Sequence, residues 1–284
     1  MINLTAALEA GLSEKKNNWN EGKLHVSDLG VSEYIDIDDR KCPRQLWLRY
    51  WGAGREELNA GTRLMFDQGH ALEERAVKLL KRGLPHDYKV IATQFDVSLG
   101  LPEGWAGRLD ILLSDGSELM VIDVKTRRGN SFRYNDGIRP TEKFQVAGYL
   151  QALSLMMTKE VSKGAILEID REGQNFAREH HFTFNQKLEK KISKTIEHVQ
   201  ELVSNEEPPD MLPPKITRNE NKGADSIKAD LPWQCSYCSY RSVSCPGAIP
   251  PEFDDNLGKV VGHIEDGEFQ EKVEGISKYV EGVI

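Results

Sequence analysis

The sequence lacks several features that mark whole classes of protein. No apolar run approaches the roughly 20 residues that a membrane-spanning helix needs. Its first 16 residues lack the basic start and the long apolar core of a secretory signal. No repeat of the kind found in solenoids or propellers is present. Cysteine is scarce, with four in 284 residues. These absences predict a cytoplasmic protein without membrane association, in a reducing compartment where disulfides are rare.

Composition and charge leave a nucleic-acid partner open. Hydrophobic residues make up 39% of the chain and charged residues 29%, which is typical of a soluble folded protein. The net charge is −8, but it is unevenly spread. Residues 246–284 hold nine acidic residues against three lysines, a balance of −6, whereas residues 40–150 hold 18 basic residues against 14 acidic ones, a balance of +4. An acidic protein overall can therefore still bind DNA through its middle section.

Apolar spacing predicts an α/β fold. Ser27 is expected to be a helix N-cap, and Gly83 is expected to follow the end of a long amphipathic helix. The helices are predicted at residues 42–50, 63–82, 141–157 and 186–204, the strands at 89–98, 105–113, 118–126, 163–169 and 178–184, and a long loop at 208–232. This order predicts a central mixed β-sheet flanked by helices.

The second and third strands form a hairpin that groups charged residues. With Asp115-Gly116 as a two-residue turn, residues whose numbers add up to 231 face each other. Because side chains alternate along a strand, Asp110, Asp123 and Lys125 then share one face. The two aspartates are expected to be diagonal neighbours, about 7–8 Å apart.

Two carboxylates this close repel each other unless a cation lies between them. Oxygen donors of this kind suit Mg²⁺ or Mn²⁺. Lys125 would stabilise negative charge on a phosphorane-like transition state or hold a water for attack. The alternative is a pair of surface aspartates at strand ends. The apolar residues around both aspartates favour the metal site.

These residues resemble a known signature. Gly107-Arg108-Leu109-Asp110, followed by Ile122-Asp123-Val124-Lys125-Thr126, resembles the PD-(D/E)XK nuclease signature. The RecB-like exonuclease branch of that superfamily adds a histidine on an upstream helix, which His70 matches, and a Q-x-x-x-Y helix, which Gln145 and Tyr149 match. The family more often has Glu at the position of Asp123, which leaves the metal preference open.

The resemblance implies roles for these residues. One or two divalent ions, Mg²⁺ or Mn²⁺, would be held by His70, Asp110, Asp123 and the main-chain carbonyl of Val124, and the catalytic residues would be Asp110, Asp123, Lys125, Gln145 and Tyr149. Each motif has an alternative explanation. A lone histidine on an amphipathic helix is usually a core or surface residue, and a tyrosine on such a helix often packs against the sheet.

The four cysteines have metal-site spacing. Cys235-x2-Cys238-x6-Cys245 is typical of a metal site, and Cys42 supplies a fourth thiolate. Zinc and an iron–sulfur cluster both fit four thiolates, and free thiols are the third alternative. The arrangement resembles the iron–sulfur nucleases, including AddB and the CRISPR-associated RecB-like exonucleases. That resemblance, supported by Val26-Ser27-Asp28-Leu29 and Cys42-Pro43-Arg44-Gln45-Leu46-Trp47, covers residues 24–248 and implies a [4Fe–4S] cluster that links the two ends of the chain.

The fold class implied is a restriction-endonuclease-like α/β nuclease core with an iron–sulfur subdomain built from both ends of the chain. The expected parts are an N-terminal helical segment at 1–62, a nuclease core at 63–205, a cluster-binding segment at 206–250 and an acidic tail at 251–284. The tail is expected either to dock beside the DNA site and compete with phosphates, or to pack as an ordinary terminal helix.

The function implied is a Mg²⁺- or Mn²⁺-dependent DNA exonuclease, with endonuclease activity open, acting on single-stranded DNA or single-stranded ends. It would work in CRISPR adaptation or in phage and prokaryotic DNA processing, with a CRISPR integrase complex or another DNA-processing protein as partner. The alternatives are a non-catalytic DNA-binding adaptor and a structural zinc protein. The predicted contacts to the DNA backbone, each of which alone is also typical of a solvated charge, are Arg44, Arg49, Lys78, Lys81, Arg127, Arg128 and Arg133.

Overall fold

The computed structural model describes residues 22–129, 132, 137–173, 176–212, 215–221, 224–230, 232–241, 243–245 and 256–262. The chain divides into two compact units. The first unit comprises residues 1–41 and 58–206, and the second comprises residues 42–57 and 207–284. Within the residues described, no helix is both long and apolar enough to cross a bilayer.

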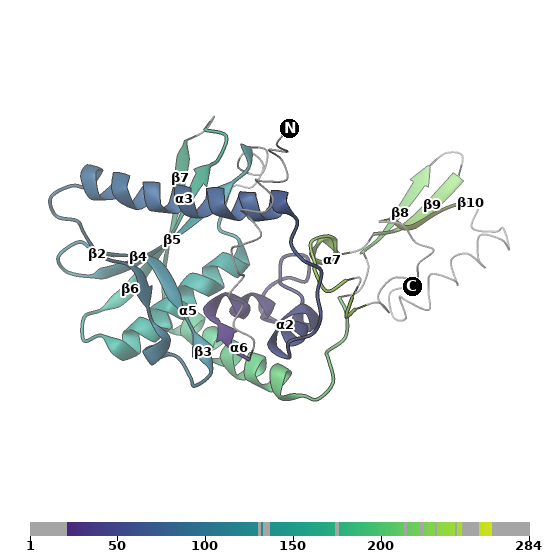
Figure 1. The fold of residues 1–284 in the computed structure, drawn as a ribbon, viewed down its shortest axis with the longest axis horizontal. Coiled ribbons are helices and arrows are strands. Elements are labelled where there is room, and N and C mark those ends of the chain that lie inside the picture. The colour runs from purple at the N-terminus through teal and green to yellow at the C-terminus, as the bar shows by residue number, and fades with distance from the viewer. Residues whose placement is uncertain are drawn as a thin grey trace, which may run out of the picture. The chain divides into compact units, whose positions relative to one another are not determined.

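The first unit is built on a five-stranded mixed sheet with the strand order β2-β4-β5-β6-β7 (Figure 1). Its strands are β2 Lys89–Asp96, β4 Arg108–Ser114, β5 Leu119–Arg127, β6 Val161–Asp170 and β7 Ala177–Thr183. β5 and β6 are parallel, and the other neighbours are antiparallel. The predicted central mixed sheet is therefore confirmed.

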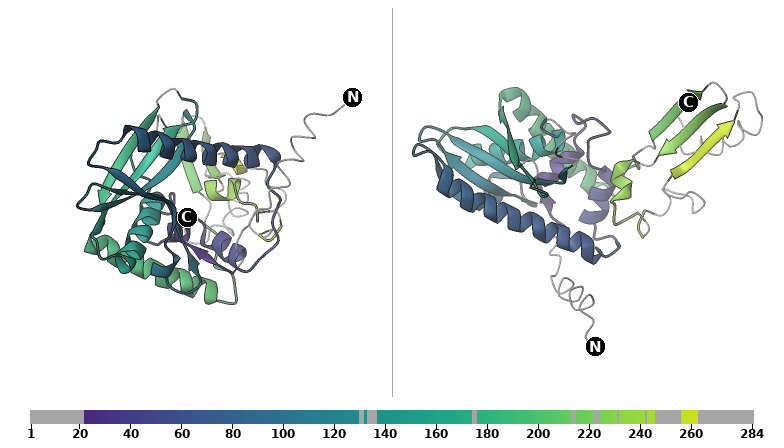
Figure 2. Two further views of the ribbon diagram at one scale, coloured as in Figure 1. Left: turned by 60° about the vertical axis from the view of Figure 1, so that its left-hand side comes forward. Right: turned by 90° about the horizontal axis from the view of Figure 1, so that it is seen from above.

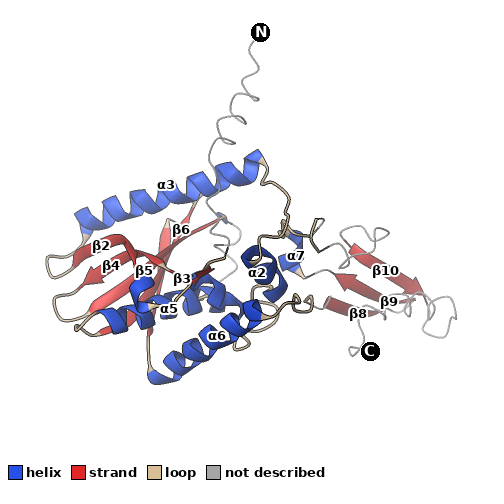
Figure 3. Cartoon of the chain, turned by 60° about the horizontal axis from the view of Figure 1, so that its bottom comes forward, coloured by secondary structure: helices blue, strands red, loops and turns tan. Residues whose placement is uncertain are grey.

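Helices cover both faces of this sheet. α3 (Ala60–Gly83) runs along one face, as both views of Figure 2 show. α5 (Pro140–Met156) and α6 (Gln186–Ser204) lie on the other side (Figure 3). The core between α3 and the sheet is made of the side chains Ala76, Ile111, Leu113, Ile122, Val124 and Ala165. Because alternate residues of β4 and β5 fill this core, the remaining residues of those strands face α5.

A short 3-10 helix, η1 (Val26–Val31), packs against α5. Its N-cap is His25 and not the predicted Ser27, because the Asp28 carboxylate accepts a hydrogen bond from the His25 N–H at 2.7 Å. Two small strands, β1 (Leu24–His25) and β3 (Trp105–Ala106), pair in parallel beside η1. A second 3-10 turn, η2 (Ser98–Gly100), contacts α5.

Both ends of α3 differ from the prediction, and one predicted strand divides. α3 begins at Ala60, because Asn59 caps it by accepting a hydrogen bond from the Thr62 N–H at 2.9 Å. Gly83 is the last helical residue and not the residue after the helix. The strand predicted over residues 105–113 divides at Gly107, where a Cβ atom would come within 2.7 Å of Val26 and 2.9 Å of Val97.

The hairpin between β4 and β5 has a different register from the predicted one. Ile111 faces Ile122 and Leu112 faces Val121, so facing residue numbers add up to 233. The loop is longer because Asp115 Oδ1 accepts hydrogen bonds from the N–H groups of Ser117 at 3.0 Å and Glu118 at 2.8 Å. A shift of two residues keeps every side chain on its predicted face.

The second unit contains α2 (Pro43–Tyr50), α7 (Trp233–Ser236) and a three-stranded antiparallel sheet. Its strands are β8 Lys215–Asn221, β9 Ala224–Asp230 and β10 Asn256–Gly262, in the order β10-β9-β8. The predicted loop at 208–232 is therefore wrong. β8 and β9 have one isoleucine each, which is too little apolar content for a period-two pattern. In the acidic tail, β10 is a strand, and residues 251–255 and 263–284 lie outside the described part.

Close packing of α5 against η1 requires Gly148. A Cβ atom there would lie 2.4 Å from Leu29 Cδ1 and 2.8 Å from Val26 Cγ1, and both side chains are fully buried. We therefore expect Gly148→Ala to lower the free energy of unfolding by about 1–3 kcal/mol. Gly83→Ala is the matched control, because a Cβ atom there meets nothing within 4 Å in the described part of the chain. Urea denaturation of both variants tests this, and equal stability of Gly148→Ala and wild type would contradict the packing.

Candidate active site

The predicted catalytic side chains meet in one cavity of the first unit. Asp110 comes from β4, Asp123 and Lys125 from β5, and Gln145 and Tyr149 from α5. Together with His70 of α3 they line a cavity of about 300 Å³. The structure thus brings together residues that are up to 79 positions apart in the sequence.

Asp110 is held on both of its carboxylate oxygens. The β4–β5 register places it opposite Asp123, one step beyond the ladder pair Ile111–Ile122. Its Oδ2 accepts a hydrogen bond from the Val124 N–H at 2.8 Å. Its Oδ1 accepts one from Gln94 Nε2 at 3.3 Å. The predicted diagonal relation of the two aspartates is replaced by a direct one.

Asp123 and Lys125 form an ion pair inside the protein. Asp123 is 1% exposed, and its Oδ2 lies 2.7 Å from Lys125 Nζ. Burial raises the pKa of Asp123 to about 6, although the Lys125 charge opposes this shift. Burial also raises the pKa of Asp110, against the Val124 hydrogen bond. Both carboxyl groups therefore lack sufficient compensating positive charge.

The charge of Lys125 is kept by its neighbours. Burial alone would lower the pKa of Lys125, but the negative charges of Asp123 and Asp110 outweigh that effect and raise it above its usual value. Its Nζ also donates a hydrogen bond to Gln145 Oε1 at 3.4 Å. Lys125 is therefore a permanent cation beside the two aspartates.

Gln145 and Tyr149 lie one turn apart on α5 and support this lysine. Gln145 Nε2 donates a hydrogen bond to the Tyr149 hydroxyl at 3.0 Å. Burial raises the pKa of Tyr149 above its usual value, so that the phenol stays neutral. The Q-x-x-x-Y helix thus fixes the amide oxygen that faces Lys125.

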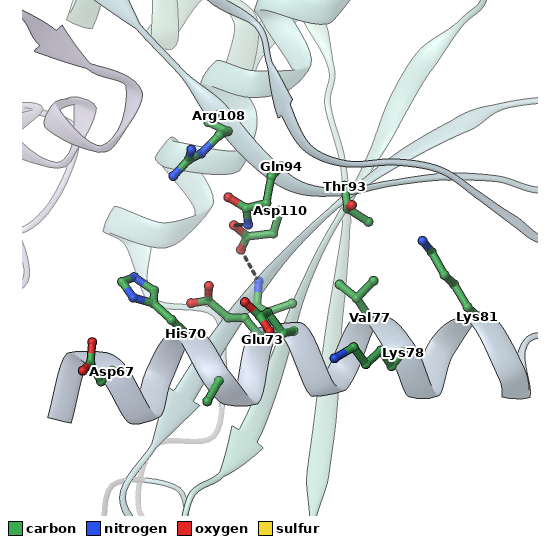
Figure 4. Close-up of a pocket in the computed structure, with 13 residues that line it drawn as sticks. Asp67, His70, Glu73, Val77, Lys78, Lys81, Thr93, Gln94, Arg108 and Asp110 are labelled. Carbon is green, nitrogen blue, oxygen red and sulfur yellow. Dashed lines mark hydrogen bonds between the residues drawn. The ribbon is translucent and has the colours of Figure 1, made fainter. Parts of the chain in front are cut away.

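α3 contributes two further groups. His70 is exposed and lines the cavity, and Glu73 is half-buried beside it (Figure 4). Burial raises the pKa of Glu73. Sequence analysis did not assign Glu73 a role, although it follows His70 by three positions, the spacing of one helix face. A wider cavity of about 730 Å³, lined by His70, Glu73 and the predicted DNA contacts Lys78 and Lys81, extends along α3.

Gln94 is a site residue that no sequence signal marked. It lies in the middle of β2, yet its φ angle is +51°, in the left-handed region. This conformation costs a non-glycine residue about 1–3 kcal/mol. Its side chain lines both cavities and contacts Asp110 (Figure 4).

The donor types of the cavity fit a hard divalent cation. Carboxylates are the ligands that Mg²⁺ and Mn²⁺ prefer. The raised pKa of Asp110 and of Asp123 shows that each carboxylate would be stabilised by added positive charge. In the described part of the chain, no three His, Cys, Asp or Glu side chains already form a metal-binding group. A bound cation would therefore need further ligands besides these side chains, or a change in their rotamers.

Some predicted DNA contacts are buried. In the first unit, Arg127 is 9% exposed and forms ion pairs with Glu142 at 2.5 Å and Glu168 at 2.9 Å. In the second unit, Arg49 is 7% exposed. Burial removes both guanidinium groups from the surface that a DNA backbone would touch, which contradicts their predicted role.

The other predicted DNA contacts differ in their surroundings. Arg44, in the second unit, is half-buried, and its Nη1 donates a hydrogen bond to the Pro209 carbonyl at 3.0 Å. Arg128, in the first unit, is exposed and lies 3.4 Å from Glu172. Arg133 lies outside the described residues.

In the second unit, the four cysteines surround one small cavity of about 30 Å³. All four are free thiols. Burial raises the pKa of Cys235 to about 11, and the other three sulfurs add to the shift. Arg44 lines the same cavity, and its buried Nε has no hydrogen-bond partner among the described residues. Among the described residues, however, no three of these thiols form a ready metal-binding group.

No curated protein matches the sequence. Among solved structures, LHK-Exo in complex with dAMP is 12% identical, with 64% of this chain and 88% of that chain covered and a TM-score of 0.45. The alkaline exonuclease LHK-Exo from Laribacter hongkongensis is 12% identical, with 66% and 95% covered and a TM-score of 0.44.

The family match is more extensive. The family model described as the PD-(D/E)XK nuclease superfamily matches residues 37–246. This range is well over half of the chain, and it includes Asp110, Asp123, Lys125 and the four cysteines. The superfamily predicted from the two aspartates and the lysine is confirmed, and the chain belongs to the PD-(D/E)XK nuclease superfamily.

Proposed function

We propose that the protein is a metal-dependent deoxyribonuclease that hydrolyses phosphodiester bonds in the cavity of the first unit. The observation that carries this proposal is the meeting of Asp110, Asp123 and Lys125 in one cavity. All three are present in a chain of the PD-(D/E)XK nuclease superfamily. This complete set favours catalysis over a non-catalytic DNA-binding adaptor, which would not need the buried lysine.

The metal site would be formed by Asp110, Asp123, His70 and the main chain of Val124, with Glu73 close by. A divalent cation bound there would activate a water and offset charge on the scissile phosphate. Asp110 is already oriented by the Val124 N–H. Asp123 is oriented by Lys125 at 2.7 Å.

Lys125 acts through its fixed positive charge. Because its ammonium lies between Asp123 and the Gln145 amide oxygen, it can turn from these groups toward a phosphate oxygen without leaving the cavity. It would position the attacking water and stabilise the negative charge that develops in the transition state. Tyr149 holds the Gln145 amide, whose oxygen accepts from Lys125 and so keeps the ammonium inside the cavity.

The specific substrate we propose is single-stranded DNA or DNA with single-stranded ends. The enzyme would degrade it from an end, as exonucleases of the RecB-like branch do. The resemblance in the Q-x-x-x-Y motif and in the cysteine spacing supports this branch. Lys78 and Lys81 along the wider cavity would contact the DNA backbone. A role in CRISPR adaptation or in phage DNA processing, in the cytoplasm and with an integrase complex or another DNA-processing protein, follows from the same resemblance.

The four cysteines would hold a [4Fe–4S] cluster, with zinc as the alternative. Cys42 precedes Cys235 by 192 intervening residues, yet both line one cavity of the second unit. A group bound to all four sulfurs would therefore close a long chain loop, which couples its binding to folding. The arrangement of Arg44 beside the sulfurs supports an anionic sulfur-ligated group.

The cleavage assignment is tested by Asp110→Ala and Lys125→Ala. We expect both variants to cut DNA at least ~10²-fold more slowly, because the lost groups act mainly in the transition state. Asp110→Ala should melt near the wild-type temperature, whereas Lys125→Ala should melt lower, because it leaves the buried Asp123 carboxylate without its partner. The measurement is the rate of product formation from end-labelled single-stranded DNA with Mn²⁺ or Mg²⁺. Lys190→Ala, on the exposed face of α6, is the matched control and should cut normally. Wild-type rates for either site variant would show that the assigned site is wrong.

The raised pKa of Asp123 predicts a pH-dependent metal requirement. The carboxylate binds a cation only when deprotonated, and its pKa of about 6 means that protons compete below that pH. The Mn²⁺ concentration for half-maximal cleavage should therefore rise about tenfold for each pH unit below 6. Melting curves over the same range control for unfolding. A metal requirement that is constant from pH 7 to pH 5 would contradict the assignment of Asp123 as a ligand.

The cluster assignment is tested by Cys238→Ala. We expect this variant to lose iron and visible absorbance and to melt at a lower temperature, because the loop between Cys42 and Cys235 is no longer closed. Ser239→Ala, at the neighbouring position, is the control and should keep the iron, the visible absorbance and the wild-type melting temperature. Chelation of free Mg²⁺ and Mn²⁺ should stop cleavage and leave the absorbance unchanged. Stoichiometric zinc without iron, in protein purified anaerobically from iron-rich culture, would exclude the cluster.

A further inference from the structure

Gln94 has a strained, left-handed backbone inside β2 and interrupts the pairing of β2 with β4. On either side of it, Thr93 faces Ile111 and Phe95 faces Leu109, so the register between β2 and β4 does not shift across Gln94, although Gln94 itself forms no ladder pair. The only shift in this ladder lies between Val90 and Ala92. The left-handed φ of +51° at Gln94 is therefore not part of a turn or of the bulge.

The left-handed backbone of Gln94 directs its side chain toward Asp110. The flanking pairs Thr93–Ile111 and Phe95–Leu109 place Gln94 across from Asp110, although these two residues form no ladder pair themselves. Its Nε2 donates to Asp110 Oδ1 at 3.3 Å, while the Val124 N–H donates to Oδ2 at 2.8 Å. The carboxylate thus has one donor on each oxygen, one from the main chain of β5 and one from the side chain of Gln94. Figure 4 shows the Gln94 amide beside Asp110 and above Glu73 and His70 of α3.

We infer that Gln94 is a positioning residue for Asp110, held in a strained backbone so that its amide fixes the orientation of the carboxylate. This inference rests on the proposed function of the site. A neutral amide suits this role, since it orients the carboxylate without cancelling the negative charge that attracts a cation. Its long hydrogen bond to Oδ1 is also weaker than the one from Val124, so Oδ1 is the oxygen that can be released to a ligand.

Three substitutions at this position separate the amide from the strain. Gln94→Ala removes the amide and keeps a Cβ atom in the left-handed conformation. Gln94→Gly removes the amide and also the strain. Gln94→Asn keeps an amide and tolerates the left-handed region. Phe176→Gly is the matched control, because Phe176 has a φ of +60° and is 75% exposed outside both cavities.

The experiment measures Mn²⁺ affinity by electron paramagnetic resonance, melting temperature, and kcat and KM for a single-stranded oligonucleotide, on the full chain. We expect Gln94→Ala and Gln94→Gly to weaken Mn²⁺ binding and lower kcat by about tenfold or more, with KM for DNA nearly unchanged. Gln94→Asn should retain more of the wild-type Mn²⁺ affinity and more of the wild-type kcat than these two variants. Gln94→Gly should melt about 2 °C or more above Gln94→Ala. Phe176→Gly should gain stability and keep wild-type Mn²⁺ affinity and kcat.

Two results would overturn the positioning role of Gln94 and leave the proposed nuclease function intact. One is wild-type Mn²⁺ affinity and kcat in Gln94→Ala. The other is a Gln94→Gly variant that melts no higher than Gln94→Ala, which would show that the backbone stores no strain. Wild-type protein that neither binds Mn²⁺ nor cleaves DNA would instead overturn the proposed function, and the positioning role with it.

Discussion

The ion pair between the buried Asp123 and the half-buried Lys125 is the constraint on which the site depends. Taking a carboxylate and an ammonium out of water is costly, and each is retained only because the other is 2.7 Å away. The compensation is incomplete, since burial still raises the pKa of Asp123 to about 6 and that of Asp110 above its usual value. Two carboxylates therefore share one lysine. A cation bound in the cavity, as the proposed function requires, would offset this excess of negative charge.

A second layer of buried charges holds the first in place. Arg127 pairs with Glu142 of α5 and with Glu168 of β6, and Arg178 of β7 pairs with Glu168 at 2.5 Å. Glu142 lies three residues before Gln145, and Glu168 faces Lys125 across the β5–β6 ladder. The end of the lysine strand, the start of the Q-x-x-x-Y helix and the next two strands are thus joined by charge pairs. Because breaking one partner leaves an uncompensated buried charge, this layer resists rearrangement of the site.

Sequence patterns identified the residues whose position depends on periodicity. Alternation along β4 and β5 placed Asp110, Asp123 and Lys125 on one face, and this held even though the hairpin register was wrong by two residues. The register depends on hydrogen bonds from the Ser117 and Glu118 N–H groups to the Asp115 side chain, which no period reveals. Arg127 was expected on the surface because a sequence does not show which arginines find two carboxylates. β8 and β9 were missed because polar strands lack an apolar alternation.

Gln94 shows where such reasoning must fail. A left-handed residue inside a strand would be expected to be glycine or asparagine, and local propensity opposes glutamine there. Natural sequences break local rules of this kind mainly at functional sites, where surrounding structure holds the strained residue. Here the surrounding structure is the β2–β4 ladder, whose pairs Thr93–Ile111 and Phe95–Leu109 flank Gln94, and the Gln94 side chain contacts Asp110. The same ladder that builds the core therefore stabilises the strained conformation. The proposed orientation of the Asp110 carboxylate by Gln94 therefore depends on the packing of the sheet, and the left-handed backbone that marks it is visible only in the structure.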